Sequence, residues 1–367
     1  MTALSISGTP TRTPVAAPSA PSGPSASATG TRERLGRARG GDLPPPRGPA
    51  SAFVISRLQD HEVSTIATQV LISDDPLTGE DSHLALYLCY ELHYRSFAGV
   101  DDAAEWDPEL LALRRRLEQR FLTALLAETP AVPPPDASTV AAALTRLIRS
   151  ATGRSLSGFM AEHGELGHLR EFAVHRSAYQ LKEADPHTWG IPRLSGRAKS
   201  ALITIQADEY GQGRPGRSHA ELFVTTMRAL GLDATYGRYL AALPGVTLAT
   251  TNLVTLFGLH RRWRGALVGH LAVFEMTSVT PMARYAAALR RLGVGEAAAE
   301  FYDVHVSADA LHERIAATDL AAGLLEEEPQ LGTDVVFGAA ALMSCERRLA
   351  DHLLACWQAG RSSLLCG

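Results

Sequence analysis

Two histidines and an aspartate recur at helical spacing in the segment His305-Val-Ser-Ala-Asp309-Ala-Leu-His312. At about 100° per residue, offsets of 0, 4 and 7 positions fall within about 60° of one helix face. Imidazole nitrogen together with carboxylate oxygen is a donor set that suits iron, manganese or zinc. The alternative is a solvated helix face on which the histidines occur by chance. The spacing therefore favours a metal-binding face, which needs support from elsewhere in the chain.

Further ligands must come from neighbouring helices, because one helix cannot fill the coordination sphere of a redox metal. Candidates are Glu183, near the end of a predicted helix, and Glu209, just before the glycine-rich segment 211–216. His219 follows this segment, in the first turn of the next predicted helix. A glycine-rich kink lets the chain fold back, so Glu209 and His219 can approach one centre. Each of the three, taken alone, is more often an ordinary polar residue.

Other acidic residues and histidines compete for the role of ligand. They are Glu91 with His93, Glu165 with His168, Glu171 with His175, and His187, which follows Glu183 beyond a proline. Glu165 and His168 have the E-x-x-H spacing of ferritin-like diiron sites. Such bundles need two pairs of this kind, and no second pair occurs at a credible position.

The composition is that of an ordinary globular protein, with 46% hydrophobic and 20% charged residues. The net charge of −4 gives no general attraction to nucleic acid or to an anionic membrane. Cys89, Cys345, Cys356 and Cys366 form no C-x-x-C pair, so we expect buried apolar thiols, an exposed Cys366 and a reducing cytoplasm. The uncharged stretch 240–259 is interrupted by polar residues, and a helix buried in a soluble core explains it better than a membrane span.

The pattern of the chain predicts an all-α fold in three parts. Residues 1–50 are rich in Pro, Ala, Ser, Gly and Thr and should form a disordered tail, because they cannot bury enough apolar surface to fold. Residues 51–150 should form an N-terminal helical region, and residues 151–367 the domain that carries the metal ligands. Helices are expected at about 84–95, 108–121, from 136 or 138 onward, and at 157–184, 195–209, 218–231, 248–277, 281–292, 296–318 and 334–358.

The order Glu183, Glu209, His219 and then His305, Asp309 and His312 resembles that of the heme-oxygenase-like diiron oxidases and oxygenases. These bacterial proteins are often labelled iron-containing redox enzymes. Short sequence motifs around these residues are also similar to those of the family, namely Leu-Tyr-Leu-Cys-Tyr-Glu-Leu-His at 86–93, Leu-Lys-Glu-Ala-Asp-Pro-His at 181–187 and Gln-Ala-Asp-Glu-Tyr-Gly at 206–211. The resemblance covers roughly residues 80–318. It implies a heme-oxygenase-like bundle of seven helices without heme.

The resemblance also implies a ligand set and a chemistry. One helix would give Glu183, a second Glu209 with His219, and a third His305, Asp309 and His312. These residues would hold two iron ions, or iron with manganese at one position. Family members with histidines at the positions of His219 and His312 look like the branch that oxygenates amine or guanidine nitrogen. Other members desaturate or cleave fatty acids and amino acids.

The expected partners follow from this chemistry. They are O2, a small-molecule substrate and a separate electron donor, either a redox protein or a small reductant, because no motif for NAD or flavin occurs. Arg176, Arg197, Arg214 and Arg217 lie near the ligand helices, and any one of them could hold a substrate carboxylate. The uncharged stretch 246–259 could instead line a pocket for an alkyl chain.

A chain of 367 residues has no room for the C-terminal cupin domain that some N-oxygenases carry, so we do not expect a fused two-step pathway. A heme protein of the same bundle, with His175 or His260 as axial ligand, is a second hypothesis. A helical interaction or thiaminase-like protein without redox metal is a third. Catalytic residues beyond the metal ligands and the oligomeric state, monomer or homodimer, are left open.

Overall fold

The computed structural model of the chain describes residues 40–59, 66–129 and 132–366. The first 39 residues of the predicted tail lie outside the described residues, so their disorder stays a prediction. Residues 40–50 are described and make specific contacts. The Gly40 amide donates to the Arg95 carbonyl, and the amide of Ala50 donates to Asp81 at 2.8 Å. A disordered tail that extends to residue 50 is therefore too long, because these residues are anchored to the helices.

All regular secondary structure in the described part of the chain is helical, as predicted. The helices are α1 (Pro49–Leu58), α2 (Glu80–Glu91), α3 (Pro108–Glu128), α4 (Val140–Arg149), α5 (Leu156–Glu162), α6 (Leu166–Gln180), α7 (Asp185–Thr188), α8 (Gly196–Glu209), α9 (His219–Ala229), α10 (Gly245–Leu259), α11 (Arg264–Arg291), α12 (Glu296–Arg314), α13 (Ala322–Glu327) and α14 (Gly332–Gln358). A π-helical segment, Ile315–Ala321, joins α12 to α13.

Helix starts follow the predicted capping residues in two places. The Asp107 side chain accepts hydrogen bonds from the amides of Glu109 and Leu110 at the start of α3. Ser218 and Glu221 form the predicted capping box at the start of α9. The cap of α4 is Thr139 rather than Asp136 or Ser138. The Asp136 side chain instead accepts from the amides of Ser138 and Thr139 in the preceding turn.

Two predicted long helices are each divided. The helix predicted at 157–184 is divided into α5 and α6, because Glu165 and His168 form a capping box that starts a new helix. The predicted end at 184 is also wrong, because α6 ends at Gln180 and Glu183 lies in the turn that follows. The helix predicted at 248–277 consists of α10 and the first half of α11, which are separated by an extended His260 and a 3-10 turn. The break predicted before Pro281 is also wrong, because α11 continues through this proline.

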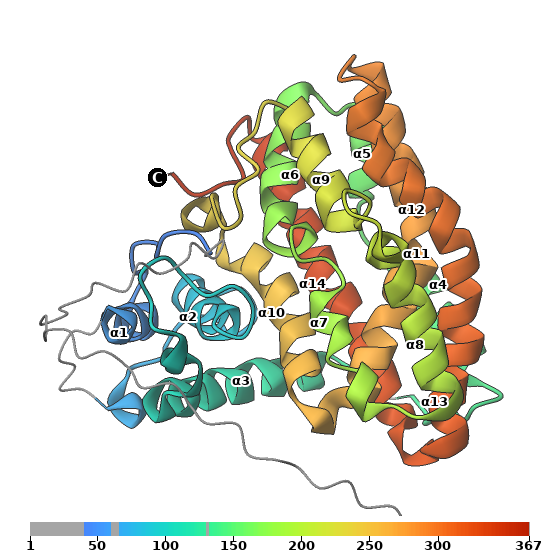
Figure 1. Cartoon of the computed structure of the whole chain (residues 1–367), viewed down its shortest axis with the longest axis horizontal. Coiled ribbons are helices and arrows are strands. Elements are labelled where there is room, and N and C mark those ends of the chain that lie inside the picture. The colour runs from blue at the N-terminus through green and yellow to red at the C-terminus, as the bar shows by residue number, and fades with distance from the viewer. Residues whose placement is uncertain (1–39, 60–65, 130–131, 367) are drawn as a thin grey trace, which may run out of the picture. The chain divides into compact units, whose positions relative to one another are not determined.

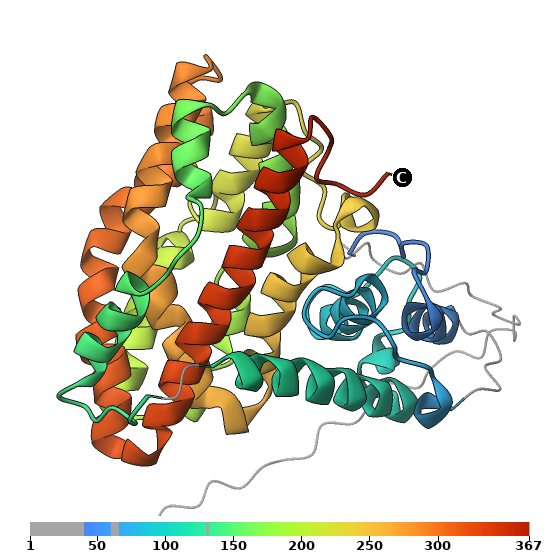
Figure 2. The same ribbon diagram turned by 180° about the vertical axis from the view of Figure 1, so that it is seen from behind.

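The long helix α11 packs against α12 and α14 over most of its length, and α9 and α5 add to this bundle. Figure 1 shows α8, α9, α11, α12 and α14 from the side, running roughly from the top to the bottom of the view, whereas α1 and α2 are seen almost end-on. From behind, α14 and α5 lie toward the viewer (Figure 2). Helix α2 packs against α1, α3 and α10. The division predicted at residue 150 stays a prediction.

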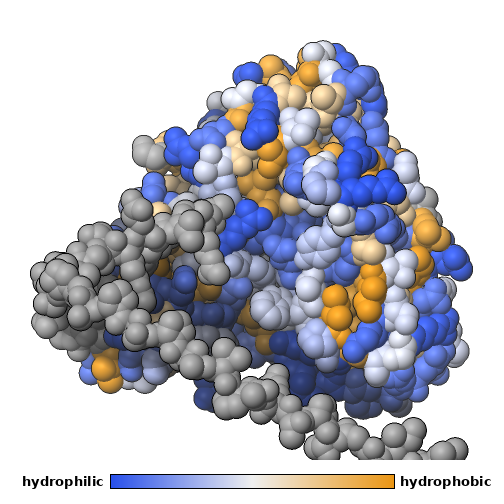
Figure 3. Space-filling model, in the orientation of Figure 1, coloured by the Kyte–Doolittle hydropathy of each residue, from blue (hydrophilic) through white to orange (hydrophobic). Residues whose placement is uncertain are grey.

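The uncharged helix α10 is almost completely buried, in contact with α2 and α14. Its location explains why the stretch is apolar without being a membrane segment. Among the described residues, no helix combines the length and the apolar character that crossing a bilayer requires. The surface in Figure 3 is mostly hydrophilic outside the grey residues, with small separate apolar areas. Cys89, Cys345 and Cys356 are buried and Cys366 is exposed, as predicted.

Candidate metal centre

Four of the predicted ligands converge inside the bundle. One donor atom each from Glu183, Glu209, His219 and His305 lies within 4.8 Å of the other three, and all four side chains are buried. Nδ1 of His219 is 2.8 Å from Oε2 of Glu209, and Nε2 of His305 is 3.5 Å from Oε1 of Glu183. The rings of His219 and His305 have their centroids 4.1 Å apart.

A second group adjoins the first and shares one member with it. Donor atoms of Glu209, Glu275 and His312 also lie within 4.8 Å of one another, and the three side chains are buried. Nδ1 of His312 is 3.4 Å from Oε2 of Glu275. Glu209 therefore stands between two sets of oxygen and nitrogen donors. We call the six residues Glu183, Glu209, His219, Glu275, His305 and His312 the metal cluster.

The turn after α8 brings Glu209 and His219 together. Gly211 has a φ of +62°, and a Cβ there would lie 2.4 Å from the backbone carbon of Arg217. Only glycine fits this close approach. The short turn therefore places the end of α8 beside the start of α9, as the glycine-rich segment predicted.

Hydrogen bonds to the far ring nitrogens fix two of the histidine tautomers. Nδ1 of His305 is 2.7 Å from the Phe301 carbonyl, which can only accept, so this nitrogen carries the proton and Nε2 is left as a donor for metal. Nε2 of His312 is 2.8 Å from Oδ2 of Asp208 and donates to this carboxylate. Its Nδ1 then faces Glu275. An outer carboxylate or carbonyl behind a histidine is the usual arrangement at metal sites.

The electrostatics of the cluster also fit a bound cation. Burial raises the pKa of Glu183, and nearby Glu209 adds to this effect, while His305 opposes it. Oε2 of Glu183 is buried without a hydrogen-bond partner among the described residues. Buried carboxylates that converge cost free energy unless positive charge compensates them. Carboxylate oxygens mixed with imidazole nitrogens are the donors that iron, manganese and zinc accept, so the residues fit such an ion.

Asp309 and Glu275 are the two exceptions to the predicted set. Asp309 belongs to α12 between His305 and His312, but its side chain lies outside what the structure describes. Glu275, on α11, was missed in the sequence. The signal was present, because Glu275 is the only Asp, Glu, Lys or Arg between Arg264 and Arg284. A lone carboxylate in an apolar helix is seldom buried without a partner.

The competing acidic residues and histidines have other contacts. Glu165 and His168 cap α6, Glu171 accepts from Trp357 and Ser363, Glu91 contacts Lys182, and His93 contacts Glu105. His187 lies 3.1 Å from His270. Both ring nitrogens of His175 are engaged, by Thr247 and Ser363, and Nε2 of His260 contacts Glu118. His175 therefore has no ring nitrogen left for an axial heme ligand.

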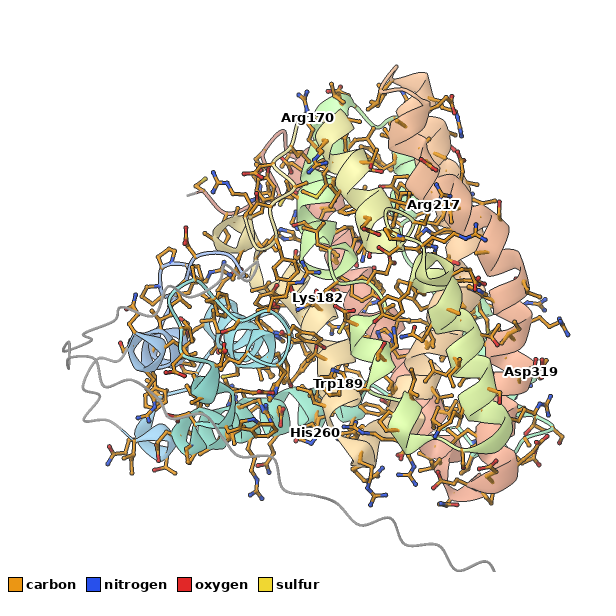
Figure 4. All side chains as sticks on the ribbon, in the orientation of Figure 1. Arg170, Lys182, Trp189, Arg217, His260 and Asp319 are labelled. Atoms are coloured by element: carbon orange, nitrogen blue, oxygen red, sulfur yellow. The ribbon has the colours of Figure 1, made fainter. Side chains whose placement is uncertain are left out.

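The four arginines considered as carboxylate binders differ in their surroundings. Arg197 is half exposed and contacts Asp319 and Glu326. Arg214 and Arg217 line an open groove of about 830 Å³ that reaches His219. Figure 4 shows Arg217 beside α12, where it contacts Glu300 at 2.6 Å. Arg176 alone is mostly buried and borders an inner cavity.

The comparisons with known proteins agree with this geometry. Residues 170–347 match the model of the iron-containing redox enzyme family. Over 146 residues, the chain is 26% identical to nitrosourea synthase from Streptomyces achromogenes subsp. streptozoticus, and this alignment covers 40% of the chain and 31% of that protein. The chain thus aligns with about a third of the length of this relative. The matched region contains the whole metal cluster, and over this region the chain is similar to the iron-containing redox enzymes.

Proposed function

We propose that the chain is a non-heme diiron enzyme that uses O2 to oxygenate a nitrogen of a small amine or guanidine, in an amino acid-like substrate. The observation that carries the proposal is the position of Glu209 in both donor groups. A carboxylate shared by two sets of donors is what a pair of metal ions requires. The similarity to a nitrosourea synthase supports nitrogen as the atom that reacts.

The proposed ligands divide between the two ions. Glu183, His219 and His305 would hold one iron, and Glu275 and His312 the other, with Glu209 between them. Asp309 would complete the second set, as the family resemblance implies. The carboxylates of Glu183, Glu209, Glu275 and Asp309 then balance the four positive charges of two ferrous ions, so the buried centre is neutral when loaded.

The reaction inserts one oxygen atom of O2 into an N–H bond, which gives an N–O–H group. The other oxygen atom leaves as water, so two electrons and two protons must be supplied. Bound iron would supply the activation of O2 and pass on these electrons. They come from an external donor, a redox protein or a small reductant, because the sequence contains no motif for NAD or flavin.

The chain itself contributes position, burial and the protonation states of its histidines. The Phe301 carbonyl and Asp208 fix the tautomers of His305 and His312, so both rings present a lone pair to the centre. Phe223 and Phe301, whose ring centroids are 5.1 Å apart, add an apolar wall beside the histidines, and the Phe301 ring lies 4.4 Å from that of His305.

Oxidation of an alkyl chain, by desaturation or C–C cleavage, is the second candidate. The inner cavity favours it in one respect, because Phe172, Phe223, Phe274 and Met282 form much of its wall. The stretch 246–259, which could have lined a pocket for an alkyl chain, belongs to α10 and does not line that cavity.

Metal content and oxygen uptake separate these possibilities. The full chain is loaded anaerobically with ferrous iron, desalted and analysed by mass spectrometry of the metal, and we expect two irons per chain. O2 consumption is then measured with a reductant and with either basic amino acids, their amines or saturated fatty acids. Faster uptake with amines or guanidines supports the proposal. Faster uptake with fatty acids alone would replace it by the second candidate, and one iron or none would contradict a diiron centre.

A further inference from the structure

The inner cavity adjoins the metal cluster along several elements at once. Its volume is about 330 Å³, within the range of small-molecule sites. Gln180 lies three residues before Glu183, Phe223 four after His219, Ser278 three after Glu275 and Tyr302 three before His305, and all four line the cavity. Residues three or four apart on a helix are neighbours on one face. The cavity therefore begins about one helical turn from the metal cluster.

The end of the cavity near the metal cluster offers a hydrogen-bond acceptor. The side chain of Gln180 is 5% exposed, and its Oε1 has no hydrogen-bond partner among the described residues. A buried carbonyl oxygen without a donor costs free energy, and a bound N–H group removes that cost. This end of the cavity is thus suited to an amine or guanidine nitrogen beside the metals.

An ion pair stands further along the same cavity. NH1 and NH2 of Arg176 donate to the two carboxylate oxygens of Glu346, at 2.8 and 2.5 Å. The exposed fractions of the two side chains are 17% and 30%, and the guanidinium lies 5.4 Å from the centre of the Phe172 ring. A guanidinium has five N–H groups and a carboxylate about four acceptor positions. Each partner therefore keeps hydrogen-bonding capacity for a third group.

Tyr302 connects the two ends. Its ring lies 5.7 Å from that of Tyr285, which stacks on Phe172 at 4.5 Å beneath the guanidinium. Burial raises the pKa of both tyrosines, so their hydroxyls stay neutral at neutral pH. The cavity wall between the ion pair and the metals is therefore aromatic and uncharged, and an aliphatic chain can pack against it.

We infer that this cavity binds a zwitterionic α-amino acid with a long basic side chain. Its carboxylate binds Arg176, its α-ammonium binds Glu346, and its side-chain nitrogen lies against Gln180 beside the metals. The inference rests on the proposed function, and it adds the pair Arg176–Glu346 as the determinant of substrate specificity.

The spacing along α6 sets the length of the substrate. Arg176 and Gln180 are four residues apart and so share one face, about 6 Å apart along the axis, and Glu183 lies three residues beyond Gln180, in the turn that follows the helix. A molecule that contacts both Arg176 and the metal cluster must bridge several ångströms. Lysine- or arginine-sized side chains span this distance, whereas those of alanine or serine do not.

The open groove at Arg217 is the alternative binding site for the substrate, but its charged side chains are exposed to solvent. The side chains of Arg217 and Glu300 are 48% and 43% exposed, so water screens their contact. Exposed pairs of this sort contribute little to recognition. The groove therefore provides matched control variants, in which the same residue types are changed outside the cavity.

Calorimetric titration of the ferrous full chain without O2 tests the inference, because no turnover occurs. The probes are L-arginine and L-lysine, their decarboxylated counterparts agmatine and cadaverine, and decanoate. We expect at least about tenfold tighter binding of one amino acid than of its amine, since Arg176 adds charge-assisted bonds to the carboxylate that the amine lacks. Arg176→Gln should remove this preference and leave the binding of the amine nearly unchanged, whereas Glu346→Gln should weaken the binding of both, because both carry the ammonium group. Arg217→Gln and Glu300→Gln, the controls, should change neither.

Equal binding of amino acid and amine, binding of decanoate alone, or no binding of any probe would overturn the inference. Arg176→Lys gives a second variant that keeps a charge but loses the bidentate contact, and it should weaken amino acid binding while circular dichroism stays unchanged. The outcome is separable from the proposed function. Preferential amino acid binding without faster O2 uptake would refute the function and keep the site, and faster uptake without this preference would do the reverse.

Discussion

Two buried polar regions adjoin each other at Lys182 and Glu183, and their buried charges are compensated in different ways. One is the metal cluster, which begins at Glu183. The other, which we call the α2 seam, consists of His83, Glu91, Lys182, Tyr236 and Asn252. Figure 4 labels Lys182 near the centre of the view. Apart from the partly buried Tyr236, the side chains of both regions are almost inaccessible to solvent, so neither region can rely on water to stabilise its charges.

The α2 seam balances its charges with the protein's own groups. Nζ of Lys182 lies 2.6 Å from Oε2 of Glu91, and the hydroxyl of Tyr236 donates to Oε1 of the same carboxylate at 2.6 Å. The ammonium also lies 4.7 and 4.3 Å from the ring centres of Tyr87 and Tyr94. One positive and one negative charge are thus enclosed together, with cation–π contacts on the remaining sides.

The metal cluster gathers charges of one sign instead. Glu183, Glu209 and Glu275 converge with three imidazoles, which are uncharged in the form that binds metal. Such an arrangement destabilises the folded chain unless cations or protons compensate it. The difference indicates that the α2 seam holds the fold together, whereas the cluster is arranged for a ligand. Substitutions in the metal cluster should therefore reduce iron binding and leave stability nearly unchanged, whereas substitutions in the α2 seam should reduce stability and leave iron binding unchanged.

The largest effect is expected from Glu209→Ala. Removal of the carboxylate common to both donor groups should lower iron from two per chain to less than one. Oxygen uptake should fall by more than about a hundredfold, beyond the effect of losing an outer partner. Folding should be nearly unchanged, since a buried acid is lost. Metal analysis, oxygen uptake and circular dichroism measure these quantities. Glu300→Gln on the exposed face of α12 is the control, and full iron loading of the alanine variant would remove Glu209 from the centre.

The metal cluster also shows what could be predicted from sequence. His305 and His312 were found because their spacing repeats with the helix, which is a local property. Glu275 has no partner at helical spacing, and only the packing of α11 on α12 gives it a role. The ion pair of Arg176 and Glu346 joins residues 170 positions apart. Contacts of that kind depend on tertiary structure, and no local pattern indicates them.

Breaking the α2 seam should instead reduce stability. Lys182→Met leaves the charge of Glu91 buried without its cation, at a cost of about 3–5 kcal/mol in the free energy of unfolding. The double variant Lys182→Met and Glu91→Gln should recover most of it, because no charge then remains buried. Urea denaturation measures both. Lys199→Met, at the less buried of the two lysines, is the control. Iron stoichiometry in the folded fraction should not change, and its loss would show that the two regions are coupled.

A smaller effect is expected from Asp208→Asn, at the edge of the metal cluster. An amide can donate to Nε2 of His312 and so favour the tautomer with a proton on Nδ1, the nitrogen that faces Glu275. The affinity for the second iron should fall by about ten- to a hundredfold, while the first iron stays bound. Titration with ferrous iron, followed by competition with a chelator, resolves the two affinities. An equal loss of affinity for both irons, or no loss for either, would mean that Asp208 does not position His312.

The smallest effect concerns His83 and the pH dependence of stability in the α2 seam. Nε2 of His83 donates to the Pro76 carbonyl and Nδ1 accepts from Asn252, so the buried ring is held in its neutral form. Burial lowers its pKa to about 4, although Asp74 and Asp75 oppose this. The unfolded imidazole binds a proton below about pH 6.5, whereas the folded one does not until about pH 4. Stability is therefore lost as the pH falls between these values.

The variant His83→Gln keeps a donor and an acceptor but cannot titrate. Between pH 7 and pH 5, we expect its free energy of unfolding to fall by about 2 kcal/mol less than that of the wild type. The comparison uses urea denaturation of the metal-free protein, so that release of iron does not contribute. The other buried histidines, such as His175 and His270, titrate equally in both proteins and cancel in the difference. His163→Gln, at a side chain that is 70% exposed, is the matched control and should behave as the wild type. Identical losses in His83→Gln and wild type would mean that the fold around α2 opens enough in acid to protonate His83 without cost.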